Sequence, residues 1–155
     1  MRRFLITLGL LGAFALPLAV SAGHTCAHLT VGGTYTSCNY DGQNLSGKVL
    51  SGATFDDTRL VGTNLSGSSL GGVDFLNSNA DDAVFTSAKL IGFDAVGTSF
   101  IGATFAGANV NGAEFVTSDL TNATFLGATG TLYLRDSSIL CNTTLKDGTV
   151  DNSDC

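Results

Sequence analysis

Large apolar residues recur at every fifth position along much of this chain. In the stretch FIGATFAGANVNGAEF they are Phe100, Phe105, Val110 and Phe115. A strand repeats its facing about every 2 residues and an amphipathic helix about every 3.6. A period of five matches neither element, so the pattern predicts a repetitive fold built from short segments.

The frame of five holds without insertion from Tyr40 to Phe125, and it has a fixed grammar. The seventeen centre positions from 45 to 125 carry seven Leu, seven Phe, one Val and two Ala. We expect the large ones to form the core. These core centres are Leu45, Leu50, Phe55, Leu60, Leu65, Leu70, Phe75, Phe85, Leu90, Phe100, Phe105, Val110, Phe115, Leu120 and Phe125.

Small residues stand two positions before most centres, and glycine stands two positions after twelve of the eighteen centres from Tyr40 to Phe125. In one pentad the sizes are exchanged, with Phe93 at the small position and Ala95 at the centre. Such compensation is expected if the two side chains share one cross-section of a packed core. The small core positions held by alanine are Ala53, Ala83, Ala88, Ala103, Ala108, Ala113 and Ala123.

This grammar predicts a solenoid. Residues two apart in an extended segment point the same way, so the small residue and the centre face inward together. The polar residue between them faces water, and glycine permits a sharp corner. Successive pentads would therefore wind into a coil in which each turn covers the apolar face of the next.

The pentads resemble the pentapeptide-repeat family, whose consensus is A-[D/N]-L-x-x. Close matches are AKLIG (88–92), ANVNG (108–112) and AEFVT (113–117), with TNLSG (63–67) as a variant. The resemblance implies an all-β fold, a right-handed quadrilateral parallel β-helix with about 20 residues per coil. The period of five by itself leaves the number of sides open.

The two ends of the chain do not follow the repeat pattern. Residues 1–22, MRRFLITLGLLGAFALPLAVSA, have two arginines, a short apolar run and a small-residue cleavage site, which is typical of a secretory signal peptide. The run is short and contains Pro17, so a transmembrane anchor is the weaker interpretation. We expect a secreted or periplasmic protein with an N-terminal cap at 23–39, the β-helix at 40–129 and a C-terminal cap at 130–155.

The charge limits the possible partners. Of the seven Lys and Arg, two precede Ala22, so cleavage leaves five basic against thirteen acidic side chains, a net charge of −8. An acidic chain predicts no nucleic-acid partner and no anionic membrane surface. Some cytoplasmic relatives mimic DNA and bind DNA gyrase. That role is the alternative, but export would place this chain in the wrong compartment.

Four cysteines flank the repeat, and an even number in an exported protein favours disulfides. Three pairings are possible. A β-helical rod would hold Cys26 and Cys38 far from Cys141 and Cys155, which favours pairing within each end. The tail CNTTLKDGTVDNSDC also resembles a terminal cap of exported pentapeptide-repeat proteins. A metal site at His24, Cys26, His28 and Cys38 is the alternative, and we expect no metal.

Candidates for catalysis are few. Asp56–Asp57 and Asp81–Asp82 are paired carboxylates of the kind that glycosidases use. Adjacent residues point in different directions, however, and both pairs fall at corner positions, so we expect no catalytic residues, no enzyme and no cofactor. The sequence favours a non-catalytic exported scaffold or protein-interaction module, a monomer or end-to-end dimer, whose unknown partner is a protein or a surface.

Overall fold

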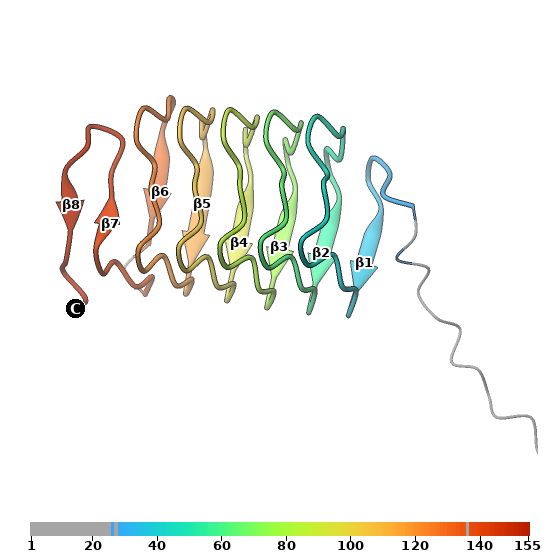
Figure 1. The fold of residues 1–155 in the computed structure, drawn as a ribbon, viewed down its shortest axis with the longest axis horizontal. Coiled ribbons are helices and arrows are strands. Elements are labelled where there is room, and N and C mark those ends of the chain that lie inside the picture. The colour runs from blue at the N-terminus through green and yellow to red at the C-terminus, as the bar shows by residue number, and fades with distance from the viewer. Residues whose placement is uncertain (1–25, 27, 136) are drawn as a thin grey trace, which may run out of the picture.

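The computed structural model describes residue 26 and residues 28–135 and 137–155. This part of the chain contains no helix, and six of its short strands form one parallel sheet in sequence order (Figure 1). The last two strands form an antiparallel hairpin. The strands are β1 (Thr34–Thr36), β2 (Thr54–Asp56), β3 (Asp74–Leu76), β4 (Asp94–Val96), β5 (Ala113–Val116), β6 (Leu132–Leu134), β7 (Thr143–Thr144) and β8 (Val150–Asp151).

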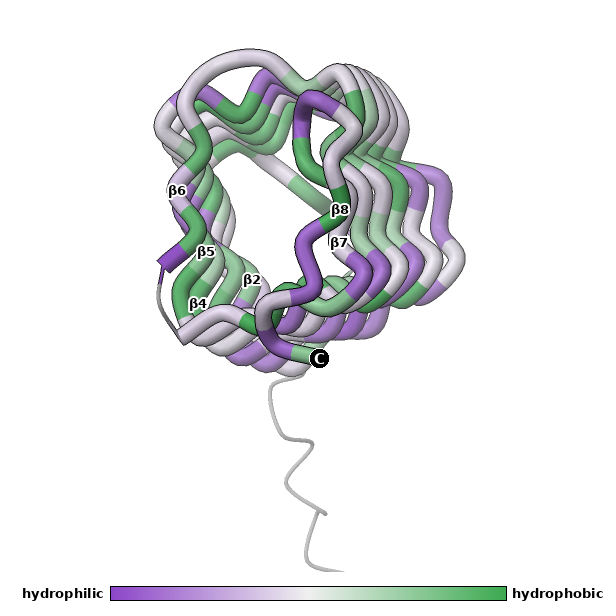
Figure 2. Tube along the Cα trace, turned by 90° about the vertical axis from the view of Figure 1, so that its left-hand side faces the viewer, coloured by the Kyte–Doolittle hydropathy of each residue, from purple (hydrophilic) through white to green (hydrophobic). Residues whose placement is uncertain are grey.

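The register fixes the number of sides. Phe55 pairs with Phe75 and Phe75 with Ala95, so neighbouring coils are offset by four pentads. Isolated parallel bridges with the same offset mark the other three sides, as in Asn44 with Asn64. Viewed along its axis, the chain is a four-sided tube with superposed coils (Figure 2). The quadrilateral parallel β-helix is therefore confirmed.

The corners use the left-handed backbone region. Gly62 has φ 63°, and the residues at the same corner in other coils, Asp82 and Asn122, have φ 55° and 61°. Only glycine, and to a lesser extent Asn and Asp, adopts this region at low cost. The glycine of the repeat is thus a corner residue, and Asp82 and Asn122 replace it with residue types that tolerate the same conformation.

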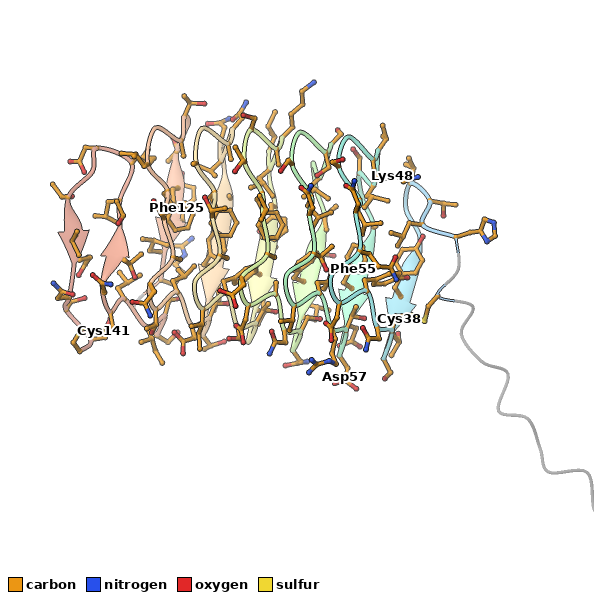
Figure 3. All side chains as sticks on the ribbon, viewed as in Figure 1. Cys38, Lys48, Phe55, Asp57, Phe125 and Cys141 are labelled. Atoms are coloured by element: carbon orange, nitrogen blue, oxygen red, sulfur yellow. A yellow bond between two sulfur atoms is a disulfide. The ribbon has the colours of Figure 1, made fainter. Side chains whose placement is uncertain are left out.

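The core lies along the axis. All fifteen large centres and all seven small-position alanines are buried. Aromatic rings stack in the axial direction, with centroids 4.7 Å apart for Phe85–Phe105 and 4.6 Å for Phe105–Phe125. Phe93 and Ala95 are both fully buried, and the Phe93 ring lies 5.2 Å from Phe75. Figure 3 shows Phe55 and Phe125 inside the coils and Asp57 at an outer corner.

A column of buried hydroxyls follows the corner after the β1–β6 sheet. The Thr98 hydroxyl donates to the backbone oxygen of Phe75 in the preceding coil (3.2 Å) and accepts from the backbone N–H of Ser78 (3.2 Å). The column links one coil to the next through side chains as well as backbone. Its members are Thr58, Ser78, Thr98, Ser118 and Ser138.

The parallel ladder extends outside residues 40–129. It begins at β1 and continues through β6 to the bridge of Thr124 with Thr144. Between β5 and β6 the offset is one residue shorter, because Ala113 pairs with Leu132. Gly130, with φ 90°, lies at this shift, and a Cβ there would come within 2.6 Å of the Asn111 backbone.

Both ends of the rod carry a disulfide. Cys26 is bonded to Cys38, and Cys141 is bonded to Cys155. Such bonds are typical of oxidising compartments. No helix long and apolar enough to cross a membrane occurs in the described ranges. The expected signal peptide, residues 1–22, lies outside the described residues.

Candidate functional site

The two acidic pairs do not converge on a common site. Asp57 and Asp82 occupy corners, with φ 51° and 55°, whereas Asp56 is the last residue of β2. Asp57 accepts a hydrogen bond from the Ser37 hydroxyl (3.0 Å). Asp81 accepts from the Ser99 hydroxyl and from the backbone N–H of Ile101. These carboxylates tie neighbouring coils together.

The alternative metal site at the N-terminal end loses two of its ligands in the structure. Cys26 and Cys38 are consumed by their disulfide, and His24 lies outside the described residues. No group of three or more His, Cys, Asp or Glu side chains suited to a metal ion occurs in the described part of the chain. A thiolate site therefore has no free ligand at either cysteine.

The outer face of the β3–β5 sheet gathers a different set of side chains. The register stacks Asp74, Asp94 and Glu114 in one line, which we call the acidic column. It also stacks Leu76, Val96 and Val116 in a second line, the apolar column. The residues between the two columns point into the core, because side chains alternate along a strand.

A shallow groove runs between these two columns. Its cavity of about 250 Å³ is lined by Asp94, Ala95, Val96, Glu114 and Val116. Val96 is 40% exposed, so the apolar wall is accessible to a partner. The groove combines one negatively charged wall with one hydrophobic wall.

The middle residue of the acidic column, Asp94, lies between two like charges. Partial burial, together with Asp74 and Glu114, raises the pKa of Asp94 above its usual value. Arg135 lies beside the other end and binds Glu114 at 2.6 Å, and this hydrogen bond lowers the pKa of Glu114. Like charges directly opposite on neighbouring strands are destabilising. Asp94 has no ion pair in the described chain.

The pattern of fives does not by itself show these columns. Asp74, Asp94 and Glu114 are four pentads apart, and each looks like an ordinary polar position when the chain is read in fives. Writing the sequence in rows of four pentads would have aligned them. The period of five leaves that row length open, whereas the family resemblance implies it, at about 20 residues per coil.

The profile described as pentapeptide repeats matches residues 37–72, 58–94 and 98–129, with eight copies. These matches cover more than half of the chain, so the protein belongs to the pentapeptide-repeat family, as the resemblance predicted. No curated protein matches the sequence.

Solved structures share the fold at low sequence identity. Full-length QnrB1, a plasmid-mediated fluoroquinolone resistance protein, has a TM-score of 0.67 and 17% identity over 72% of this chain and 60% of QnrB1. A trypsin-treated QnrB1 variant has a TM-score of 0.50 and 19% identity, covering 72% of this chain and 55% of that one. HetL from the cyanobacterium Nostoc, involved in heterocyst differentiation regulation, has 23% identity over 79% of this chain and 57% of HetL, with a TM-score of 0.38. QnrB1 shares the fold with this chain, and the chain spans less than two thirds of the length of each of these proteins.

Proposed function

We propose that this protein is an exported, non-catalytic interaction module that holds a protein partner against the outer face of its β3–β5 sheet. The observation that carries the proposal is the groove between the acidic and apolar columns. An in-register row of carboxylates costs stability, and the fold does not need it. Several equivalent outward positions of the same rod carry Asn, Ser or Thr instead, as at Asn64, Ser69 and Thr104.

The chemistry of the groove indicates the kind of partner. Interfaces combine an apolar contact with a polar rim, and complementary charge sets specificity and orientation. A protein surface with Lys or Arg side chains next to aliphatic ones would match both walls. Asp94 would gain the cation that the described chain does not supply.

Export is the second part of the proposal. Residues 1–22 have the pattern of a signal peptide, and the two disulfides suit an oxidising compartment. We propose that cleavage near Ala22 leaves a short N-terminal segment before the rod, with residues 23–39 and 130–155 as its end caps. Cell fractionation and the mass of the mature chain test this step. An uncleaved cytoplasmic protein would favour the gyrase-binding alternative instead.

Site-specific photo-cross-linking tests the surface. A photo-reactive amino acid at Val96 should capture a discrete partner in intact cells, whereas the same group at Thr104, on the opposite side of the rod, should not. Asp94→Lys should abolish capture from residue 96 and leave the purified chain folded. Equal capture from both positions, or capture that survives Asp94→Lys, would reject this face as the contact surface.

A further inference from the structure

The two ends of the rod are closed in different ways. At the C-terminal end, the chain's own last segment pairs with the final coil. The Asp154 carboxylate accepts from the backbone N–H of Leu140 (3.0 Å), and the Asn152 side chain accepts from that of Asn142 (2.8 Å). β8 lies against β7 in the same region. An extended acidic segment thus satisfies the backbone of a terminal coil.

The N-terminal end is covered only in part. Gly32 donates to Ser51, and the Tyr35 hydroxyl binds backbone atoms of His28 and Thr30. In the part of the chain that the structure describes, the backbone N–H and C=O groups of Asn44 and Val49 have no hydrogen-bond partner. In each later coil the equivalent groups pair with the preceding coil, as Asn64 N–H does with Gln43. Residues 43–45 and 48–50 are therefore open edges on two adjacent sides of the tube, and they meet at the turn of Ser46 and Gly47.

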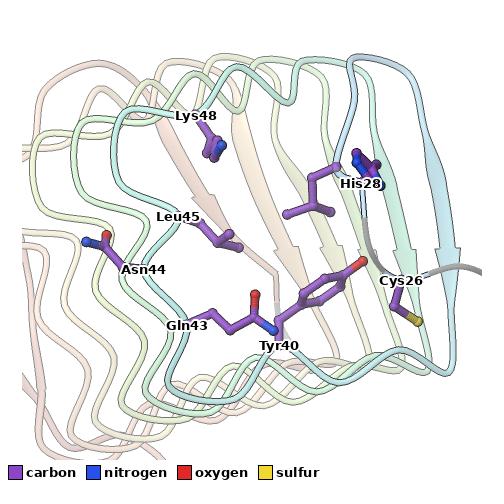
Figure 4. Close-up of a pocket in the computed structure, with 8 residues that line it drawn as sticks. Cys26, His28, Tyr40, Gln43, Asn44, Leu45 and Lys48 are labelled. Atoms are coloured by element: carbon purple, nitrogen blue, oxygen red, sulfur yellow. The ribbon is translucent and has the colours of Figure 1, made fainter.

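A cavity of about 310 Å³ lies beside this open edge (Figure 4). Its apolar lining comes from Leu29, Leu45 and the ring of Tyr40, and Lys48 and His28 line it as well. Neither Lys48 nor His28 has a salt-bridge partner among the described residues. The volume is at the lower end of the range of ligand pockets. It suits one bulky side chain or a small molecule.

Tyr40 supplies the most specific observation. This residue is 2% exposed, it lines the cavity, and its hydroxyl has no hydrogen-bond partner among the described residues. Burial and the nearby Tyr35 raise its pKa to about 12, so the hydroxyl stays protonated and able to donate. An unpaired buried hydroxyl costs stability. The residues stacked on Tyr40 in later coils, such as Leu60 and Phe100, have no hydroxyl.

We infer that the N-terminal end binds an acidic segment of a partner protein, which bends at the Ser46–Gly47 corner, pairs with the open edges on both sides of it and places an apolar side chain in the cavity. The segment's backbone would pair with Asn44 and Val49 by strand addition. Its carboxylates would meet Lys48 and His28, and an oxygen would accept from Tyr40 after a small shift of the lining side chains. The inference adds a second contact surface to the proposed interaction module.

Selection from a random heptapeptide library against the purified mature protein tests this site. Recovered peptides should be rich in Asp or Glu and contain a large apolar residue. Fluorescence anisotropy should show binding weakened about fivefold by Tyr40→Phe, which removes one hydrogen bond, and at least tenfold by Lys48→Glu. Amide shifts in NMR spectra should concentrate at Asn44 and Val49.

Two controls separate binding from folding. Tyr40→Phe should melt at or above the wild-type temperature, because it removes an unpaired hydroxyl. Tyr133→Phe, on an exposed tyrosine of the last parallel strand, should change neither affinity nor melting temperature. Cross-linking from residue 96 should be unaffected by Tyr40→Phe, so failure at one surface is distinguishable from failure at the other.

Two results would overturn the inference directly. The selection could recover peptides that are not enriched in Asp or Glu, or the recovered peptides could bind with an affinity that neither Tyr40→Phe nor Lys48→Glu weakens. Sodium hexanoate shifting the same amides as strongly as the peptides would assign the cavity to small carboxylates. Concentration-dependent self-association that Lys48→Glu abolishes, measured by sedimentation, would assign the edge to a second copy of the chain.

Discussion

At the scale of single residues, the fold depends on how each pentad divides one cross-section of the core between two side chains. The exchange of Phe93 and Ala95 shows this division most clearly, because both residues are fully buried and the Phe93 ring still meets Phe75 and Phe115. Interiors are packed closely enough that volume at one position must be balanced at its neighbour. The summed volume of the two side chains therefore matters more than which of the two positions holds the larger one.

The exchange can be tested by a double-mutant cycle. Phe93→Ala should lower the free energy of unfolding by about 3–5 kcal/mol, because it opens a cavity in a core that cannot collapse. Adding Ala95→Phe should recover most of that loss by restoring the order found in most other pentads. Urea denaturation gives both values. If the double variant is no more stable than Phe93→Ala, the two side chains do not share one packing space.

At the scale of elements, neighbouring coils are held by more than the backbone ladder. Each buried hydroxyl of the corner column donates to a backbone oxygen of the preceding coil, and four of the five also accept from a backbone N–H of that coil. The sequence shows only a small polar residue at these positions. Which backbone groups the hydroxyls satisfy depends on which residues the neighbouring coils bring beside them.

Thr98→Val tests the hydroxyl column with almost no change of shape. It removes the donor to Phe75 and the acceptor for Ser78, so we expect a loss of about 1–3 kcal/mol in the free energy of unfolding. Thr54→Val is the matched control, since Thr54 is half-buried and its hydroxyl makes no hydrogen bond within the described chain. Chemical denaturation of both variants measures the difference. Equal losses of unfolding free energy in the two variants would show that the hydroxyl column does not contribute to stability.

The acidic column predicts a pH dependence. The pKa of Asp94 is higher in the folded chain than its ordinary 3.8, so the folded state holds the Asp94 proton more tightly than the unfolded state does. The contribution of protonated Asp94 to stability is therefore lost as pH rises through the folded-state pKa. Asp94→Asn should therefore stabilise the protein at neutral pH by about 0.5 kcal/mol, the scale of one cross-strand pair. The gain should shrink as pH falls towards 3.8.

Denaturation curves at several pH values check this dependence. Glu114→Gln should have the opposite sign at neutral pH, because the hydrogen bond from Arg135 lowers the pKa of Glu114 in the folded state. A gain from Asp94→Asn that does not vary with pH would contradict the electrostatic explanation.

At the scale of the whole molecule, the rod is a one-dimensional stack whose coils contact only their neighbours. Stability in such proteins is close to a sum of local terms, so the ends are the places where unfolding starts. The two disulfides lie at those ends, and they join cysteines that are 12 and 14 residues apart in sequence, respectively. They protect the terminal coils and leave the central coils to their own packing.

Removing the second disulfide with Cys141→Ser and Cys155→Ser should therefore act locally. A loop of this length is worth about 3 kcal/mol in chain entropy. We expect hydrogen exchange to lose protection over residues 139–154 while the amides of β3 and β4 keep theirs. Uniform loss of protection along the rod would show that the coils unfold as one unit.

The sequence by itself determined the repeat, the inward and outward positions and the corners, because these follow from side-chain size and backbone freedom within each pentad. Leu65 at a centre and a glycine at the next corner are readable without any other coil. The tertiary structure decided what depends on the offset of four pentads between coils. Stacking Asp74, Asp94 and Glu114 creates the acidic column, and in the described chain the edge at Asn44 stays unpaired beside the cavity. Contacts between residues a full coil apart are set by how the turns close, and a period of five does not specify that closure.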